Sequence, residues 1–320
     1  MKVASKQNAQ LHMLFGNDVY EFSNQFKRFE NSLLKEKQEM KQLLKKRYFL
    51  LFLLMLLYLA SDAQNQMGNL VFQDDFRIID TVRLEVLYQF DFIEDTLKYD
   101  EKLTDQQVLQ VGYQNSKYFS KLLFTNDSIN TILEEQNAKN LKSPPKAAAM
   151  YEIIRDKKEK TFEVTYRSDD IVFRYFEDIP ELCWVIQSER KTIREYSCQK
   201  ASTTFRGRKY EAWFTPEIPI REGPYKFGGL PGLILKMQDS QKQFIYTCIG
   251  IKRIKESIKI RNWQYTETKR TKLNEFLERK HKNTVNYYKS RGVTAMIKKD
   301  GKFIEVPMDF SLPYNPIELE

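Results

Sequence analysis

Apolar and polar side chains alternate most regularly between Val82 and Phe92. Every second residue from Val82 onwards is apolar or aromatic, and only Leu87 breaks the alternation. A period of two places successive side chains on opposite faces of a strand. The segment therefore predicts a half-buried β-strand.

Similar patterns recur along the chain and predict further strands. Short apolar or alternating runs bounded by Gly, Asn, Asp or Ser are typical of strands in an antiparallel sheet. A late hairpin is expected around Asp300-Gly301, a strong turn dipeptide, with arms at 295–297 and 302–306. The other predicted strands lie at residues 107–112, 152–155, 161–166, 171–176, 183–188, 192–203, 208–215, 232–238 and 243–254.

Two segments repeat their apolar residues at helical spacing. The first follows Asn126-Asp127-Ser128 and stops before Ser143, and the second runs from about Thr268 to Lys282. Sequential antiparallel strands crossed by one or two helices form a curved sheet or an incomplete barrel. We therefore expect a mainly β fold of the α+β class, with the helices packed on one face of the sheet.

A cationic cluster and an apolar run precede these elements. Lys45-Lys46-Arg47 leads into an uninterrupted apolar run from Tyr48 to Ala60, and Ser61-Asp62-Ala63 matches the small-x-small cleavage pattern. Residues 40–63 therefore predict a secretory signal peptide. The run is shorter than the roughly 20 apolar residues of a spanning helix, which makes a permanent signal anchor the less favoured alternative. The expected product is exported and soluble and begins near Gln64.

The residues ahead of this signal do not fit a normal signal peptide. An n-region is short and basic, whereas residues 1–39 carry mixed charges that include Asp18, Glu30 and Glu39. We expect translation to begin at Met40, with residues 1–39 an overextension of the reading frame or a disordered extension. A cytoplasmic tail on a membrane anchor is the alternative.

Composition limits the chemistry of the expected mature chain, residues 64–320. Its net charge is only +5, from 42 basic and 37 acidic residues, and its one histidine is His281. Zinc sites and Ser-His-Asp triads draw on histidine, and none of the paired spacings that mark them is present. We therefore predict no catalytic residue, metal or cofactor, and expect His281 to be solvated on a basic helix.

Three cysteines remain for an oxidising compartment. If the strand from Cys183 and the strand through Cys198 join at Arg190-Lys191, the two cysteines face each other within disulfide reach. Arg-Lys is poor chemistry for a two-residue turn, and a slip of one residue separates the thiols. Three buried free cysteines, including Cys248, are the alternative.

The hexamer Gly229-Leu230-Pro231-Gly232-Leu233-Ile234 is the most specific motif of the chain. Pro231 suits the second position of a type II turn, Gly232 suits the positive φ of the third, and a strand follows. We expect the hexamer to be structural, with Gly228 and Gly229 allowing close backbone approach. An anion-binding nest of backbone N–H groups is the alternative.

Together with its flanks from Phe205 to Phe227, the hexamer resembles the signature of the GLPGLI family of exported proteins from Gram-negative bacteria. The resemblance covers about residues 80–255. It implies one β-rich domain over residues 64–320, located in the periplasm or at the periplasmic face of the outer membrane, and it implies no reaction. The strand order also resembles, more loosely, periplasmic half-barrels of the LolA type, which hold lipid acyl chains.

Basic residues gather in two parts of the chain, with aromatic residues interleaved. Arg206-Gly207-Arg208-Lys209 is followed by Tyr210, and the cations of residues 252–261 are followed by Trp263 and Tyr265. In an exported protein such a surface would meet lipid headgroups or lipopolysaccharide rather than nucleic acid. Ordinary solvated strand faces are the alternative.

The predicted strands carry more large aromatic residues than a thin core needs. Either the helices cap them completely, or they leave a groove for an apolar chain or partner segment, which is the version we expect. The sequence therefore predicts a non-enzymatic binding or accessory protein for an apolar ligand or an outer-membrane partner. An envelope hydrolase or transferase with a site built from scattered residues is the alternative.

Overall fold

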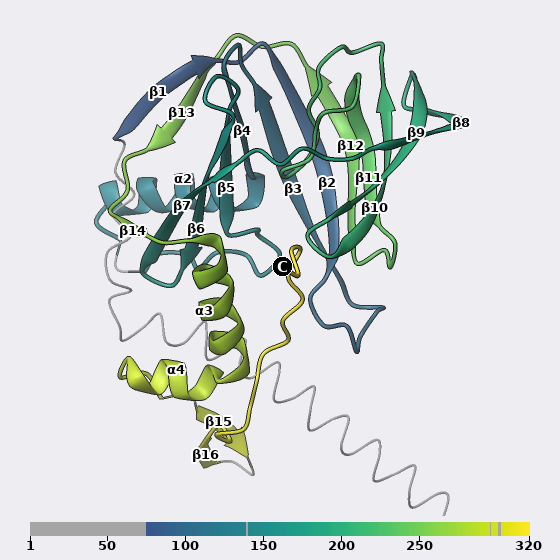
Figure 1. The fold of residues 1–320 in the computed structure, drawn as a ribbon. Coiled ribbons are helices and arrows are strands. Elements are labelled where there is room, and N and C mark those ends of the chain that lie inside the picture. Colours follow the sequence, from purple (N-terminus) through teal and green to yellow (C-terminus); the bar gives the residue numbers. More distant parts are fainter. Residues whose placement is uncertain (1–74, 139, 295, 300–301) are drawn as a thin grey trace, which may run out of the picture. The chain divides into compact units, whose positions relative to one another are not determined.

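The computed structural model of the protein describes residues 75–138, 140–294, 296–299 and 302–320 (Figure 1). The predicted signal peptide, residues 40–63, and the segment before it lie outside the described residues. Contacts divide the described chain into a hairpin within 296–305 and a larger unit of residues 75–294 and 306–320. In the hairpin, β15 (Met296–Lys299) pairs antiparallel with β16 (Lys302–Glu305), which confirms the predicted pairing of the two arms; Asp300-Gly301 lie outside the described residues.

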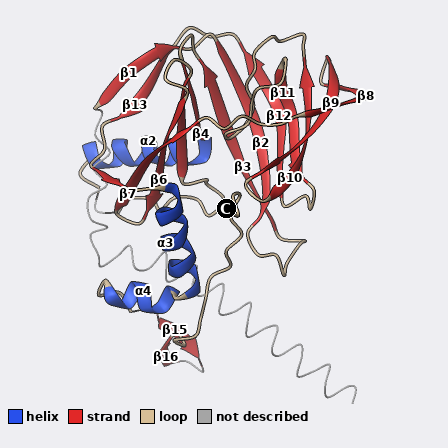
Figure 2. Cartoon of the chain, in the orientation of Figure 1, coloured by secondary structure: helices blue, strands red, loops and turns tan. Residues whose placement is uncertain are grey.

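Twelve strands of the larger unit form one curved, open sheet (Figure 2). The chain runs from β2 to β7 in one antiparallel series and from β8 to β12 in a second, and the two series join where β12 pairs with β2. The edges are β8 and β14, which is parallel to β7. The strands are β2 (Leu84–Ile93), β3 (Lys102–Val111), β4 (Asn115–Ser120), β5 (Tyr151–Asp156), β6 (Thr161–Ser168), β7 (Ile171–Asp178), β8 (Val185–Ile193), β9 (Tyr196–Phe205), β10 (Arg208–Thr215), β11 (Leu233–Asp239), β12 (Phe244–Lys252) and β14 (Tyr265–Glu267).

Three helices and a two-stranded ribbon complete the larger unit. The ribbon pairs β1 (Phe76–Thr81) with β13 (Ser257–Arg261). The helices are α2 (Lys121–Glu135), α3 (Arg270–Lys282) and α4 (Thr284–Ser290). The mainly β fold of the α+β class is thus confirmed. The strands β1, β4, β13 and β14 were not predicted.

Helix α2 begins earlier than the sequence predicted. Ser120 is its N-cap, and the Ser120 hydroxyl accepts a hydrogen bond of 3.0 Å from the Leu123 backbone N–H. The predicted cap residues Asn126 and Asp127 lie inside the helix and are buried. Their polar side chains bind neighbouring segments instead of the helix terminus, so the cap pattern gave the wrong start.

The two longer helices pack on opposite faces of the sheet, rather than on one. The inner face carries Tyr88 and Phe90, and on this face Phe276 of α3 contacts Phe173 of β7 with ring centroids 5.1 Å apart. On the outer face, Asp127 of α2 pairs with Arg167 of β6 at 2.6 Å. Because strand side chains alternate between faces, α2 and α3 cover different sides of the same strands.

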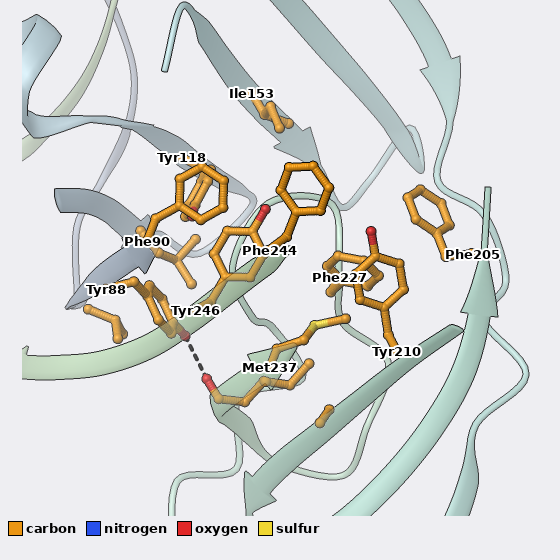
Figure 3. Packing of buried hydrophobic residues seen from close by; sticks show 14 of the residues in the cluster. Tyr88, Phe90, Tyr118, Ile153, Phe205, Tyr210, Phe227, Met237, Phe244 and Tyr246 are labelled. Atoms are coloured by element: carbon orange, nitrogen blue, oxygen red, sulfur yellow. Dashed lines mark hydrogen bonds between the residues drawn. The ribbon is translucent and has the colours of Figure 1, made fainter. Parts of the chain in front are cut away.

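The inner face is filled by aromatic side chains (Figure 3). Phe90 stacks on Tyr246 with centroids 4.5 Å apart, and both side chains are at most 2% exposed. The core is closed mainly by a loop, residues 216–232, which we call the capping loop. Its Phe227 packs against Phe205 and Tyr210 with centroids 5.1 and 4.7 Å away. Within the described residues the predicted apolar groove is therefore closed.

Candidate functional site

The hexamer Gly229-Leu230-Pro231-Gly232-Leu233-Ile234 forms the end of the capping loop and the start of β11. The backbone N–H of Gly232 donates to the carbonyl of Leu230 at 2.8 Å, which closes a three-residue turn centred on Pro231. Gly232 has a positive φ, as predicted, but its value of 157° is far from the roughly 80° of the third position of a type II turn; Gly229 also has a positive φ, of 91°. The predicted type II turn is therefore wrong, whereas the strand that follows it is confirmed.

Glycine is required at position 232 both for its positive φ, which other residues rarely adopt, and for space. A Cβ on Gly232 would lie 2.1 Å from the carbonyl oxygen of Thr215, which is backbone and fixed in β10. A Cβ on Gly228 would lie 2.8 Å from the carbonyl oxygen of Arg221. The close backbone approach expected at Gly228 is thus present, whereas the nearest atom at Gly229 is 3.8 Å away on Trp184.

Hydrogen bonds tie the hexamer to the sheet. The hydroxyl of Tyr88, fully buried on β2, donates to the carbonyl of Ile234 at 2.7 Å (Figure 3). The N–H groups of Gly229 and Leu233 donate to carbonyls of the same loop, those of Arg221 and Ile218. Backbone donors engaged in this way are not available to an anion, so the geometry favours the structural interpretation of the hexamer over a nest.

The capping loop also carries a lysine that is buried among charged groups. Lys226 has a side chain 0% exposed, and its Nζ lies 2.5 Å from a carboxylate oxygen of Glu177 and of Glu318. The Nζ also donates to the hydroxyl of Tyr175 at 3.0 Å. Burial acts to lower the pKa of Lys226, but Tyr175, Glu318 and Glu177 raise it above its ordinary value. The lysine is therefore held charged within the core.

The cysteine pairing expected from the sequence is wrong. Cys198 lies opposite Lys191 across β8 and β9, and the hairpin turns between Ile193 and Tyr196 instead of at Arg190-Lys191. Cys183 precedes β8, and all three cysteines are free thiols. Burial raises the pKa of the Cys198 and Cys248 thiols to about 11. Such thiols are protonated and unreactive at neutral pH.

The basic district predicted around Arg206 is not an open surface. Arg206 pairs with Glu177 and Glu318, and Arg208 donates to Asn315 at 2.7 Å. The adjacent Tyr210 is buried in the core. These cations are partners of internal groups. The sequence did not distinguish these paired cations from solvated ones, because both kinds of cation occur in polar segments of the chain.

An open polar surface lies elsewhere, on the outer face around Trp213 of β10. The Lys191 ammonium lies 3.8 Å from the centroid of the Trp213 ring. Lys236 of β11 is the residue directly opposite Trp213 in the strand pairing. The indole N–H donates to Glu211 at 3.2 Å, and Glu211 also pairs with Lys200 at 2.9 Å. Among the described residues, neither Lys191 nor Lys236 has a carboxylate partner. The surface therefore has, beside an aromatic ring, two cations that form no ion pair with a described residue, although the nearby Glu211 acts on Lys191.

Strand register extends this surface across the sheet as a polar row. Helix α2 packs on β3 and β4 and helix α3 on β7, so neither covers the outer face of β9 to β12. Partial burial and the neighbouring Lys236 lower the pKa of Lys191. An anion bound there would relieve the repulsion between the lysines. The row consists of partly exposed residues on five neighbouring strands: Trp213, Lys236, Thr247, Gln89 and Gln106. We call it the Trp213 face.

A buried carboxylate lies on the inner face, opposite Phe90 of β2. Asp105 of β3 is 0% exposed and accepts hydrogen bonds from Ser120 at 3.1 Å, Gln107 at 3.2 Å and the N–H of Ala149 at 3.0 Å. It forms no ion pair with any residue that the structure describes. Burial raises its pKa, although these hydrogen bonds act in the opposite direction. The ionised form is thus disfavoured in the folded state.

Replacing Asp105 by asparagine is expected to stabilise the protein at neutral pH and not in acid. The unfolded chain ionises at the ordinary pKa, so folding of the native chain is penalised above that pH and not below it. Urea unfolding should show a gain of about 1 kcal/mol at pH 7 that disappears near pH 3.5. The half-exposed Asp91 provides the control variant D91N. A gain that is the same at both pH values would contradict the assignment.

Within the described residues, no group of three or more His, Cys, Asp or Glu side chains is placed to hold a metal ion. No described helix has the length and apolar character needed to span a bilayer. The fold is that of a β-rich α+β domain, and its Trp213 face is polar and partly exposed.

Comparison with known proteins identifies the family of the chain. The family model of PNGase F-II, described as "N-glycanase peptide, N-terminal domain", matches residues 112–276. Because this match spans more than half of the chain, the chain belongs to the family. Two solved structures, of PNGF-II in the C2 and P21 space groups, are similar with TM-scores of 0.42 and 0.41 and 14% identity in both cases. The similarity covers 63% of this chain and only 34% of each PNGF-II chain. A comparison with curated proteins found no match.

Proposed function

We propose that the protein is an exported, non-enzymatic binding module whose Trp213 face recognises an acidic glycoconjugate. The observation that carries the proposal is the position of Trp213 between Lys191 and Lys236, two cations without a carboxylate partner among the described residues. An acidic sugar presents an apolar ring face together with a carboxylate, phosphate or sulfate. An aromatic ring flanked by lysines matches both features.

The amide and hydroxyl groups of the same row support a carbohydrate ligand. Gln89, Gln106 and Thr247 offer both donors and acceptors on a partly exposed surface. The family name adds a connection with glycans, since PNGase F-II is described as an N-glycanase. The family match covers its N-terminal domain, so a binding role beside a glycan-processing activity is the form of the proposal that fits this chain.

Location forms a second part of the proposal. The signal-peptide pattern of residues 40–63 and the resemblance to the GLPGLI family support a place in the periplasm or at the periplasmic face of the outer membrane. Acidic glycoconjugates such as lipopolysaccharide are available there. An apolar ligand would have to displace the capping loop, because the aromatic residues of the inner face are already buried.

Replacing Trp213 by alanine is expected to weaken binding of an acidic glycan at least about tenfold, as loss of a central aromatic contact does. Binding is measured by isothermal titration calorimetry with a sialylated N-glycan and its desialylated form. The variant K191A/K236A should remove the preference for the acidic form. Lys209, exposed on the same face of β10, provides the control variant K209A.

Three outcomes would contradict this proposal. Equal affinity of the W213A variant for the acidic glycan would remove Trp213 from the site. Equal affinity of the native protein for both glycans would remove the role of the lysines. Saturable binding of an apolar dye near one-to-one, without glycan binding, would instead favour the apolar-ligand version.

A further inference from the structure

Residues 311–320, which we call the strap, run as an extended segment along the larger unit. They contain no helix or strand. Apart from Glu318, which is 6% exposed, no strap side chain is fully buried. The strap begins at α3, where the N–H of Leu312 donates to the carbonyl of His281 and the His281 ring binds the carbonyl of Pro313 at 2.7 Å. His281 is therefore a strap contact and not the solvated residue that the sequence predicted.

Side chains of the sheet hold the strap largely through its backbone. Arg208 donates to the carbonyl of Pro316 at 2.7 Å, and the hydroxyl of Tyr210 donates to the carbonyl of Ile317 at 3.3 Å. The N–H of Leu319 donates to the carbonyl of Arg206 at 3.0 Å. Contacts of this kind recognise an extended peptide with little regard to its side chains.

Glu318 alone inserts a charged side chain into the unit. Its carboxylate lies 2.5 Å from the Nζ of Lys226, and the hydroxyl of Tyr225 donates to it at 2.5 Å. Arg206 and Arg270 approach its second oxygen at 3.7 and 3.4 Å. Three cations and a hydroxyl thus surround one carboxylate. We call this group the carboxylate socket.

The socket is held together by a carboxylate that belongs to the sheet. Glu177 of β7 pairs with Lys226 at 2.5 Å, with Arg206 at 3.2 Å and with Arg270 at 3.4 Å. Without Glu318, these three cations would keep Glu177 as a common partner and carry two uncompensated positive charges. A buried site of that charge attracts an anion strongly. The donors that face Glu318 are therefore preorganised by residues outside the strap.

We infer that the socket and the backbone donors beside it form a peptide-binding groove for an extended segment bearing a glutamate, and that the strap of this chain occupies it. The inference is independent of the Trp213 face, which lies on the other side of the sheet. The Asn315 side chain accepts from Arg208 and donates to the carbonyl of Ile93, each at 2.7 Å, and Tyr314 and Ile317 pack against the core, whereas Leu319 is 56% exposed. The Glu318 carboxylate supplies the charged contact of the strap within this groove. An acidic peptide segment of another chain is thus a competing ligand for the same groove.

The test begins with the full chain carrying a protease site inserted at the exposed residues Met308 and Asp309. After cleavage, the strap should remain bound and should exchange with a labelled synthetic peptide of residues 311–320. A peptide with E318Q should bind the strap-free protein at least about tenfold more weakly, because it loses the charge-assisted contacts. A peptide with S311A, altered at an exposed position, should bind as the native peptide does.

A second arm leaves the chain uncut. The tethered strap has a high effective concentration in the native protein and should exclude the labelled peptide, whereas the E318Q chain should admit it. Loss of the circular dichroism spectrum when the strap leaves would overturn the inference, because the strap would then be part of the fold and not a ligand of a preformed groove. Equal binding of the native and E318Q peptides would also overturn it.

Discussion

Replacing Gly232 by alanine is expected to destabilise the protein by about 3 kcal/mol or more, the largest effect of any single methyl group considered for this chain. The added Cβ would lie 2.1 Å from the carbonyl oxygen of Thr215 and 2.9 Å from the nitrogen of Pro216. Neither atom belongs to a flexible side chain, so relief requires movement of β10 away from β11. Urea unfolding followed by circular dichroism measures the loss.

Gly250 of β12 supplies the matched control. A Cβ at that position meets only the Cβ of Leu87 at 3.5 Å, an ordinary contact distance. The variant G250A should therefore remain within about 0.5 kcal/mol of the native protein, as expected of a substitution without a clash. A G232A variant as stable as G250A would show that the close approach of β10 and the hexamer is not a constraint on folding.

Replacing Lys226 by methionine is expected to destabilise the protein by about 3 kcal/mol, as removal of one partner from a buried ion group does. The variant keeps the apolar length of the side chain but leaves Glu177 and Glu318 without their closest cation. Since Arg206 and Arg270 still contact both carboxylates, the loss should be partial rather than complete. Thermal and urea unfolding provide the measurement.

Adding E318Q to K226M isolates the electrostatic part of the lost stability. In the double variant K226M/E318Q one unpaired carboxylate is removed, so part of the lost stability should return. The exposed Lys209 gives the control K209M, which should leave stability unchanged. A K226M variant with native stability would mean that the buried lysine contributes nothing to holding the capping loop.

Local pattern was enough to predict much of the fold. The alternation from Val82 to Phe92 places the same side chains inward as the structure does, because the period of a strand is fixed by its own backbone. The entry of the hexamer into a strand followed in the same way from apolar residues after Gly232. The family match extends over residues 112–276, which include that hexamer.

Predictions that depended on a neighbour in space were wrong for the turn between β8 and β9 and for the cysteine pairing. The turn between β8 and β9 lies at Arg194-Glu195, where Arg194 adopts a φ of 55°, and a bulge between Ile186 and Arg190 shifts the register. Cys183 therefore does not face Cys198. A bulge is decided by packing against the adjacent strand, and no local residue pattern marked this one.

The Trp213 face could be found only after the sheet was assembled. Lys191, Trp213 and Lys236 come from three different strands and are separated by more than twenty residues from one another. Their spacing in sequence carries no motif. The register of the four strands β8 to β11 brings them together, because opposed residues on neighbouring strands lie close to one another.

The sequence by itself determined most of the strands of the sheet, which side chains of each such strand share a face, and that an apolar strand follows Gly232, because these properties depend on the backbone within a few residues. Only the tertiary structure decided that β12 pairs with β2, that a loop and a strap close the inner face, and that Lys226 meets Glu318 across 92 residues of sequence. A lysine in sequence has the same chemistry whether it is solvated or buried. Its partners, and with them its role, follow from the loops that the folded sheet brings together.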